Sequence, residues 1–166
     1  MLIFRKCDWT ATKYSLLYCF AALYLSISYA AAQTLTPEVP NPQFGDIAAV
    51  FPHPGTPTGA VIVYNPIICN QIGSAACEFF RVHEHGHVAL QHHFQPSIHP
   101  MARERDADQF AARNANPQAV LAGWHLFMNG GSSANWHTYG SPYQRAKRLC
   151  NFAIQANNWI GPFPCP

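Results

Sequence analysis

Apolar residues follow a strand-like pattern in one segment of the chain. Residues 59–64 read Gly-Ala-Val-Ile-Val-Tyr, a β-branched apolar run that ends at Asn65-Pro66. Such side chains favour strands, and proline interrupts the hydrogen bonding of a central strand. The pattern therefore predicts one strand here, which we place at the edge of a sheet.

Four later segments carry apolar residues at helical spacing. In residues 74–93 the apolar and histidine side chains recur every three or four positions, and Ser74 can cap the start. Residues 101–114, 117–128 and 143–159 continue the pattern, with a proline in the first turn of the second of these. A strand or a few strands followed by about four helices predicts a small α+β domain with a short sheet.

The segment before the predicted strand has no such pattern. Residues 33–58 contain six prolines, which makes a helix improbable there. We expect an extended or irregular lead-in over residues 33–58, followed by one domain over residues 59–166. A chain of 166 residues is long enough for one modest core.

The N-terminus has the order of a secretory signal. Three basic residues precede an apolar run over residues 14–29, and alanines occupy positions 30–32. This order is typical of a signal peptide, so we expect residues 1–32 to be removed after Ala32 or Ala30. The alternative is an uncleaved membrane anchor, because the apolar stretch approaches the roughly 20 residues that span a bilayer.

Charge excludes some classes of partner. Charged residues make up 11% of the chain, and the predicted signal holds three of the ten basic and one of the eight acidic residues. The remaining chain is formally neutral. It therefore has no electrostatic basis for binding nucleic acid, and it would meet a membrane only if the signal were retained.

Cysteines support export to an oxidising compartment. Of six cysteines, four lie beyond the predicted signal, at positions 69, 77, 150 and 165. An even number in an exported chain predicts two disulfides, and we favour Cys69–Cys77 and Cys150–Cys165 because each closes a short loop. A cysteine zinc site would need closely paired cysteines, which this spacing lacks. We expect a periplasmic or secreted protein.

The predicted helix over residues 74–93 contains His83-Glu84-His85-Gly86-His87, an H-E-x-x-H motif. Residues four apart share one helix face, so His83 and His87 can bind one zinc ion with Glu84 beside it. Zinc lowers the pKa of a bound water towards about 7, and a carboxylate can then take its proton for attack on a carbonyl. Nine histidines make such pairs easy to find by chance, and Glu84 is the discriminating residue.

Glu104 on the next predicted helix is the candidate third ligand. His-His-Glu is an established zinc set that leaves one position open. Asp108 follows one turn later and is placed to accept a hydrogen bond from a ligand imidazole. The rival third ligand is His93, but Leu90 stands where the metzincin pattern needs glycine to turn the chain, so His93 is expected to stay on the helix. The other candidates, His53, His85, His92 and His99, are interpreted as surface or structural residues.

These two motifs resemble the gluzincin peptidases that include the CAAX-processing proteases and their short soluble relatives. Those proteins pair H-E-x-x-H with E-x-x-A-D, matched here by Glu104 and Ala107-Asp108. They also carry His-Pro followed by Arg, matched in stretched form by His137, Pro142 and Arg145. The resemblance implies a zincin-like fold with the motif on its active-site helix.

The same resemblance implies roles for further residues. His137 would stabilise the oxyanion of the tetrahedral intermediate, and Arg145 would be structural or contact an acidic group near the metal. Val61, Ile62, Val63 and Tyr64 would form the edge strand that pairs with an extended peptide, which gives broad sequence tolerance.

The sequence thus predicts an exported metallopeptidase that uses one zinc ion to hydrolyse peptide bonds in a peptide or protein substrate. Two alternatives stay open. One is a non-catalytic exported protein that binds zinc or copper, although a purely structural site has no use for Glu84. The other is a membrane-anchored processing peptidase, which requires the signal to be uncleaved.

Overall fold

The computed structural model describes residues 36–131 and 135–165. The predicted signal segment, residues 1–32, lies outside the described residues. None of the helices in the described part of the chain combines the length and apolar character needed to cross a bilayer.

A three-stranded sheet forms the first layer of this α+β fold. Its strands are β1 (Glu38–Pro40), β2 (Ala48–Pro52) and β3 (Ala60–Tyr64), in the spatial order β1-β3-β2. β1 is parallel to β3, whereas β2 is antiparallel to it. The lead-in expected to precede the domain therefore supplies two strands of its sheet.

The expectation that β3 is an edge strand is wrong. β3 lies between β1 and β2 and hydrogen-bonds to both. Pro66, which suggested an edge, lies beyond the strand as the first residue of the next helix. The prolines of the strands themselves, Pro40 and Pro52, are the last residues of the two outer strands, where a missing N–H costs least.

The helices agree with the sequence pattern except at three places. Four are close to the expected bounds: α3 (Ser74–Ala89), α4 (Pro100–Asn114), α5 (Pro117–Met128) and α7 (Pro142–Gln155). Two were not expected: α2 (Pro66–Ile72), which the Asn65 side chain caps, and the short α6 (Trp136–Tyr139). α3 ends at Ala89 instead of near residue 93, because Gln91 adopts a left-handed conformation with φ 56°. A short 3-10 helix, η1 (His92–Phe94), follows.

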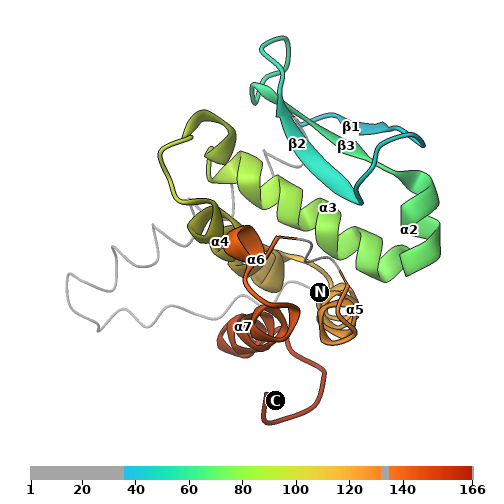
Figure 1. Ribbon diagram of the computed structural model, residues 1–166, viewed down its shortest axis with the longest axis vertical. Coiled ribbons are helices and arrows are strands. Elements are labelled where there is room, and N and C mark those ends of the chain that lie inside the picture. Colours follow the sequence, from blue (N-terminus) through green and yellow to red (C-terminus); the bar gives the residue numbers. More distant parts are fainter. Residues whose placement is uncertain (1–35, 132–134, 166) are drawn as a thin grey trace, which may run out of the picture.

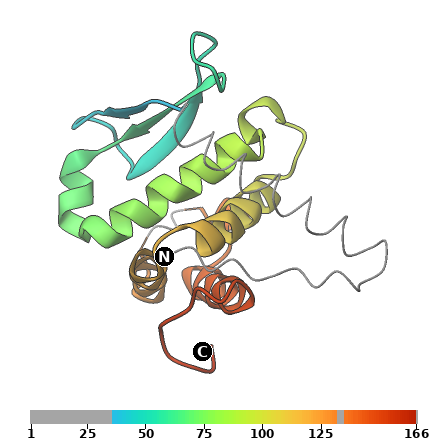
Figure 2. The same ribbon diagram turned by 180° about the vertical axis from the view of Figure 1, so that it is seen from behind.

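α3 lies at the centre of the fold. The sheet covers one side of this helix, while α4, α5 and α7 lie on the other side in both views (Figures 1 and 2). The helices bury Phe79, Val120, Phe127 and Leu149 completely. Gly123 permits this packing, because a Cβ atom there would lie 2.6 Å from the Phe79 ring. A helix covered on two sides holds its side chains in fixed positions, and this is the helix that carries the H-E-x-x-H motif.

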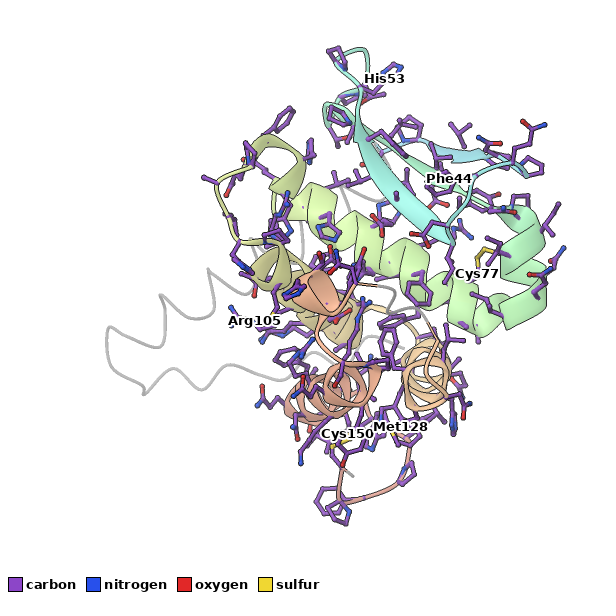
Figure 3. All side chains as sticks on the ribbon, viewed as in Figure 1. Phe44, His53, Cys77, Arg105, Met128 and Cys150 are labelled. Carbon is purple, nitrogen blue, oxygen red and sulfur yellow. A yellow bond between two sulfur atoms is a disulfide. The ribbon has the colours of Figure 1, made fainter. Side chains whose placement is uncertain are left out.

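Both predicted disulfides are confirmed. Cys69–Cys77 links α2 to α3, and Cys150–Cys165 links α7 to the C-terminal segment (Figure 3 labels Cys77 and Cys150). Disulfides persist in oxidising compartments and are rare in the reducing cytosol. The pairing therefore indicates an oxidising, extracytoplasmic environment.

Candidate metal centre

α3 presents the two histidines of the motif on one buried face. His83 and His87 are four residues apart, and their residues are 2% and 7% exposed. Glu84 is also buried. Burial of three ionisable side chains in one turn is costly unless they bind each other or an ion.

α4 brings Glu104 against this face. Glu104 Oε2 lies 3.1 Å from His83 Nε2, and Oε1 lies 3.5 Å from His87 Nε2. The Nε2 atoms of the two histidines are themselves 3.1 Å apart. These three residues can hold a metal ion, since one ligand atom from each lies within 4.8 Å of the others. In residues 36–131 and 135–165, no further His, Cys, Asp or Glu joins the group.

The spacing of the donors suits a small tetrahedral ion. Two ligands about 2.0–2.1 Å from a tetrahedral zinc lie about 3.3–3.4 Å apart. The 3.1 Å between the two Nε2 atoms and the 3.1 Å from His83 Nε2 to Glu104 Oε2 lie close to that value, and the 3.5 Å from His87 Nε2 is measured to the other oxygen of Glu104, Oε1. Nitrogen and carboxylate oxygen donors are also a set that zinc accepts in proteins.

The centre attracts positive charge. Burial alone would lower the pKa of His83, but the close carboxylates of Asp108 and Glu104 outweigh it and raise the pKa to about 10. Burial would raise the pKa of Glu104, yet His83 and His87 hold it well below its usual range. A site that binds a proton this strongly also favours a cation, which would displace that proton.

Asp108 and Arg145 support the centre from behind. Asp108 Oδ1 lies 3.0 Å from His83 Nδ1, although the N–H direction is not aligned well enough for a regular hydrogen bond. Arg145 donates to both Asp108 oxygens, from Nε at 2.9 Å and from Nη2 at 2.7 Å. Burial would raise the pKa of Asp108, but Arg145 and His83 lower it to about 2. Asp108 therefore lies beside a candidate ligand imidazole, as expected, but the expected hydrogen bond from that imidazole is not formed, while Arg145 contacts an acidic residue next to the donor group.

Glu84 is held by the sheet. Its Oε2 accepts a hydrogen bond from the backbone N–H of Val50 at 3.0 Å. Burial and the charge of Glu104 raise the pKa of this carboxyl, and together they exceed the opposing influence of the neighbouring histidines and of the Val50 hydrogen bond. The carboxylate is therefore fixed between α3 and β2 and is a stronger base than an exposed glutamate.

A pocket of about 670 Å³ opens beside these donors. Its lining includes His83, Glu84, His87 and Glu104. The remaining lining residues come from β2 and the segment before it, from α3, from the α3–α4 connection, from α4, from α6 and the residue before it, and from α7: Asp46, Ala48, Ala49, Val50, Pro52, Phe80, His92, His93, Pro96, Arg103, Asn135, Tyr139 and Arg145. The candidate donors and Glu84 therefore border the same space.

The strand beside the pocket is β2 and not the predicted one. Val61, Ile62, Val63 and Tyr64 form the central strand β3 and do not line the pocket. Their place is taken by Ala48, Ala49, Val50 and Pro52. Short strands without an alternating pattern are not distinguishable from a loop in sequence, so no signal pointed to β2.

The outer edge of β2 faces the centre. The Ile47 carbonyl accepts a hydrogen bond from the Asn65 N–H, and the His53 N–H donates to the Gly59 carbonyl. The backbone groups of these two positions therefore point towards β3. In an antiparallel pair such positions alternate with positions whose backbone groups point outward. Ala48, Val50 and Pro52 are the outward positions, which agrees with the bond from Val50 to the motif. Their carbonyl groups and the Ala48 N–H form the strand edge beside the pocket.

His137 does not reach the site. Its side chain is exposed and is not part of the pocket lining. Tyr139, two residues later in α6, lines the pocket, and its ring lies 5.1 Å from the Arg145 guanidinium. Burial and the charges of nearby carboxylates raise the pKa of Tyr139 to about 12, so the phenol keeps its proton at neutral pH. Only its proximity to the expected His137 could have suggested Tyr139 from sequence.

The other histidines that were weighed as ligands differ in their burial. His53 and His99 are exposed, and His53 lies in the loop between β2 and β3 (Figure 3). His85 and His92 are buried, where His85 binds Glu38 of β1 at 2.7 Å and His92 contacts His87. His93 is not a member of the donor group. The reason differs from the one expected, because α3 ends before it and its Nε2 lies 3.3 Å from the Thr58 carbonyl.

Comparison with known proteins gives no relative. A scan against protein-family models, a search of curated proteins and a search of solved structures each found no match.

Metal analysis tests the donor set. We expect about one zinc per chain in the purified protein, and loss of that zinc in His83→Ala, His87→Ala and Glu104→Ala, because an ion held by only three protein ligands depends on each of them. His93→Ala should retain the metal, and so should Asp106→Ala, which removes an exposed carboxylate from the same helix. Zinc retained in Glu104→Ala but lost in His93→Ala would show that the third ligand is misassigned.

Proposed function

We propose that this chain is an exported zinc metallopeptidase that hydrolyses peptide bonds with a zinc-activated water. The observation that supports it best is the convergence of His83, His87 and Glu104 at one side of a pocket, with Glu84 beside them. Two imidazoles, one carboxylate and a neighbouring second carboxylate are the parts that such a reaction needs.

Two features favour catalysis over storage or a structural metal. A structural zinc site is closed by four protein ligands, whereas three donors border a pocket here. Glu84 is also buried beside the donors without belonging to them, and a purely structural site gains nothing from that cost.

Zinc, when bound, would supply a Lewis acid that acidifies water and polarises the substrate carbonyl. In the proposed reaction Glu84 takes the proton of the attacking water and then delivers it to the leaving amine. Val50 fixes one oxygen of this carboxylate, which limits its orientations. The raised pKa of Glu84 matches it more closely to a proton transfer near neutral pH.

We assign stabilisation of the oxyanion to Tyr139 in place of His137. An oxyanion needs a donor that remains protonated, and the pKa of Tyr139 is raised to about 12. Its ring is supported by Arg145, which itself stacks on Phe127 at 4.3 Å. A donor held on a buried support needs little reorganisation when charge develops.

The edge of β2 is the proposed binding place for an extended peptide or protein segment. Backbone pairing with a strand edge gives affinity with little dependence on side chains. The site thus fits substrates of varied sequence. The substrate-binding role that was expected of β3 is assigned to β2.

Kinship to the short soluble relatives of the CAAX-processing gluzincins, and with it a zincin-like fold, is part of the proposal. The H-E-x-x-H helix and the Glu104–Asp108 helix support it. The stretched His-Pro element does not, because His137 lies outside the pocket and only Arg145 of that element adjoins the centre.

The proposal is tested with a broad peptide library and the purified disulfide-bonded protein. We expect cleavage that a chelator abolishes and that one equivalent of zinc restores. A protein that binds zinc but cleaves no peptide would support the non-catalytic metal-binding alternative. N-terminal sequencing of the exported protein should find a start at residue 33 or 31, and an intact N-terminus would support the membrane-anchored alternative.

Replacing Tyr139 by phenylalanine removes one proposed oxyanion donor. We expect kcat to fall by about 10²–10³-fold, the range measured for losing such a donor, while zinc content is unchanged. Steady-state kinetics on one cleaved peptide measure this. Tyr143→Phe, at an exposed tyrosine, and His137→Ala should stay near wild type. A loss in His137→Ala without a loss in Tyr139→Phe would reverse the assignment.

A further inference from the structure

His92 makes a contact with the metal centre that its sequence position does not suggest. Its Nδ1 lies 2.9 Å from the Nδ1 of His87, and the two rings meet edge to face with centroids 5.0 Å apart. His92 is only 5% exposed. The contact is therefore a buried polar interaction directly behind a metal-ligand candidate.

The end of α3 creates this contact. The helix stops at Ala89, Leu90 caps it by donating its N–H to the Gly86 carbonyl, and Gln91 turns the chain with φ 56°. A left-handed conformation is unfavourable for a residue other than glycine, so the surrounding structure has to stabilise it. The result of the turn is that η1 returns His92 to the back of His87.

Hydrogen-bond chemistry assigns the direction of the contact. The Nε2 of His87 faces His83 and Glu104, which makes it the atom available to a metal. A neutral imidazole that binds a metal through Nε2 carries its proton on Nδ1 and is a donor there. Two protonated nitrogens 2.9 Å apart would point their hydrogens at each other and repel, so His92 Nδ1 is unprotonated and accepts this hydrogen bond.

We infer that His92 is a positioning residue of the metal centre, which orients His87 and strengthens its binding to the metal. This inference rests on the metal centre of the proposed function. It adds a second residue that contacts a ligand imidazole on the side away from the metal. His83 has the carboxylate of Asp108 behind it, and His87 has a neutral imidazole. Partners of this kind hold the tautomer and ring angle of a ligand, and their loss typically weakens metal binding by about 10–100-fold.

Zinc affinity of matched variants tests the inference. His92→Phe keeps a planar ring but has no acceptor, whereas His92→Asn places an amide oxygen close to the position of Nδ1. His93→Phe applies the same change one residue later, at a side chain that lines the same pocket. Affinity is measured on the full-length exported protein by competition with a chromophoric chelator, and the visible spectrum of the cobalt-substituted protein reports the ligand geometry.

We expect His92→Phe to weaken zinc binding by about 10–100-fold and to change the cobalt spectrum. His92→Asn should recover most of the affinity and His93→Phe should match wild type. Equal affinities in His92→Phe and wild type would overturn the inference. Equal losses in His92→Phe and His92→Asn would overturn it too, since they would indicate a packing role.

Folding is controlled by the melting temperature of each protein with the metal removed. If His92→Phe does not fold, His92→Asn is compared with His92→Gln, whose amide extends towards the Nε2 position and away from His87. Equal affinities of these two variants would overturn the inference. A wild-type protein that binds no zinc overturns both the metal centre and this inference, whereas zinc binding without peptide cleavage overturns only the proposed function.

Discussion

Replacing Glu84 by glutamine is expected to reduce peptide hydrolysis by at least about 10²–10⁴-fold while zinc stays bound. Glutamine keeps the size of the side chain and can still accept the hydrogen bond from Val50, but it cannot take a proton from water. General base catalysis typically contributes a factor of that size. Zinc content and kcat/KM are measured on the same preparation, so that metal loss and loss of the base are separated.

Glu78→Gln is the matched control for this experiment. Glu78 lies on the same helix, is exposed and is not part of the pocket lining. Its replacement should leave both zinc content and hydrolysis unchanged. Hydrolysis that survives in Glu84→Gln would mean that the activity comes from another site or from a contaminating enzyme, and the role of Glu84 would be wrong.

Replacing Arg145 by methionine is expected to lower the free energy of unfolding by about 3–5 kcal/mol. The guanidinium and the Asp108 carboxylate are both buried and bind each other through two hydrogen bonds. Removing one partner leaves a charge buried without its counter-charge, and measured losses for such changes fall in that range. Because domains are stable by only about 5–15 kcal/mol, denaturant unfolding should detect the change easily.

Two further variants define the origin of this loss. Arg113→Met replaces an exposed arginine of α4 and should change stability by no more than about 0.5 kcal/mol. In the double variant Arg145→Met/Asp108→Asn the loss should be smaller than the sum of the single losses, because the unpaired carboxylate is gone. A loss below about 1 kcal/mol in Arg145→Met would show that the pair does not stabilise the fold.

The positions of residues that depend only on local spacing in the sequence were predictable. The 3.6-residue repeat of a helix places His83 and His87 on one face whatever surrounds them, and it places Asp108 one turn after Glu104. The two disulfides close short loops, so chain proximity favoured the right pairs. Helix starts were also legible, since prolines and polar caps act on their immediate neighbours.

Residues whose place depends on distant contacts were not predictable. β2 pairs with β3 through backbone groups that every sequence has, so the sequence does not state which strand becomes the edge. The turn at Gln91 carries no glycine, so nothing in the sequence indicated that it returns His92 to His87, and His92 was interpreted only as a surface or structural residue. α6 has four residues, too few for a periodic pattern, and this left Tyr139 unrecognised and His137 favoured.

The sequence by itself predicted the candidate donors His83, His87 and Glu104, the position of the proposed base Glu84 beside them, the proximity of Asp108 and the cysteine pairs. Only the tertiary structure decided that the edge of β2, Tyr139 and His92 lie around them. The physical reason is the distance along the chain over which each kind of interaction acts. Helical periodicity and short loops restrict residues within one or two turns of each other, whereas the packing of β2, η1 and α6 around α3 depends on the burial and hydrogen bonding of the whole domain.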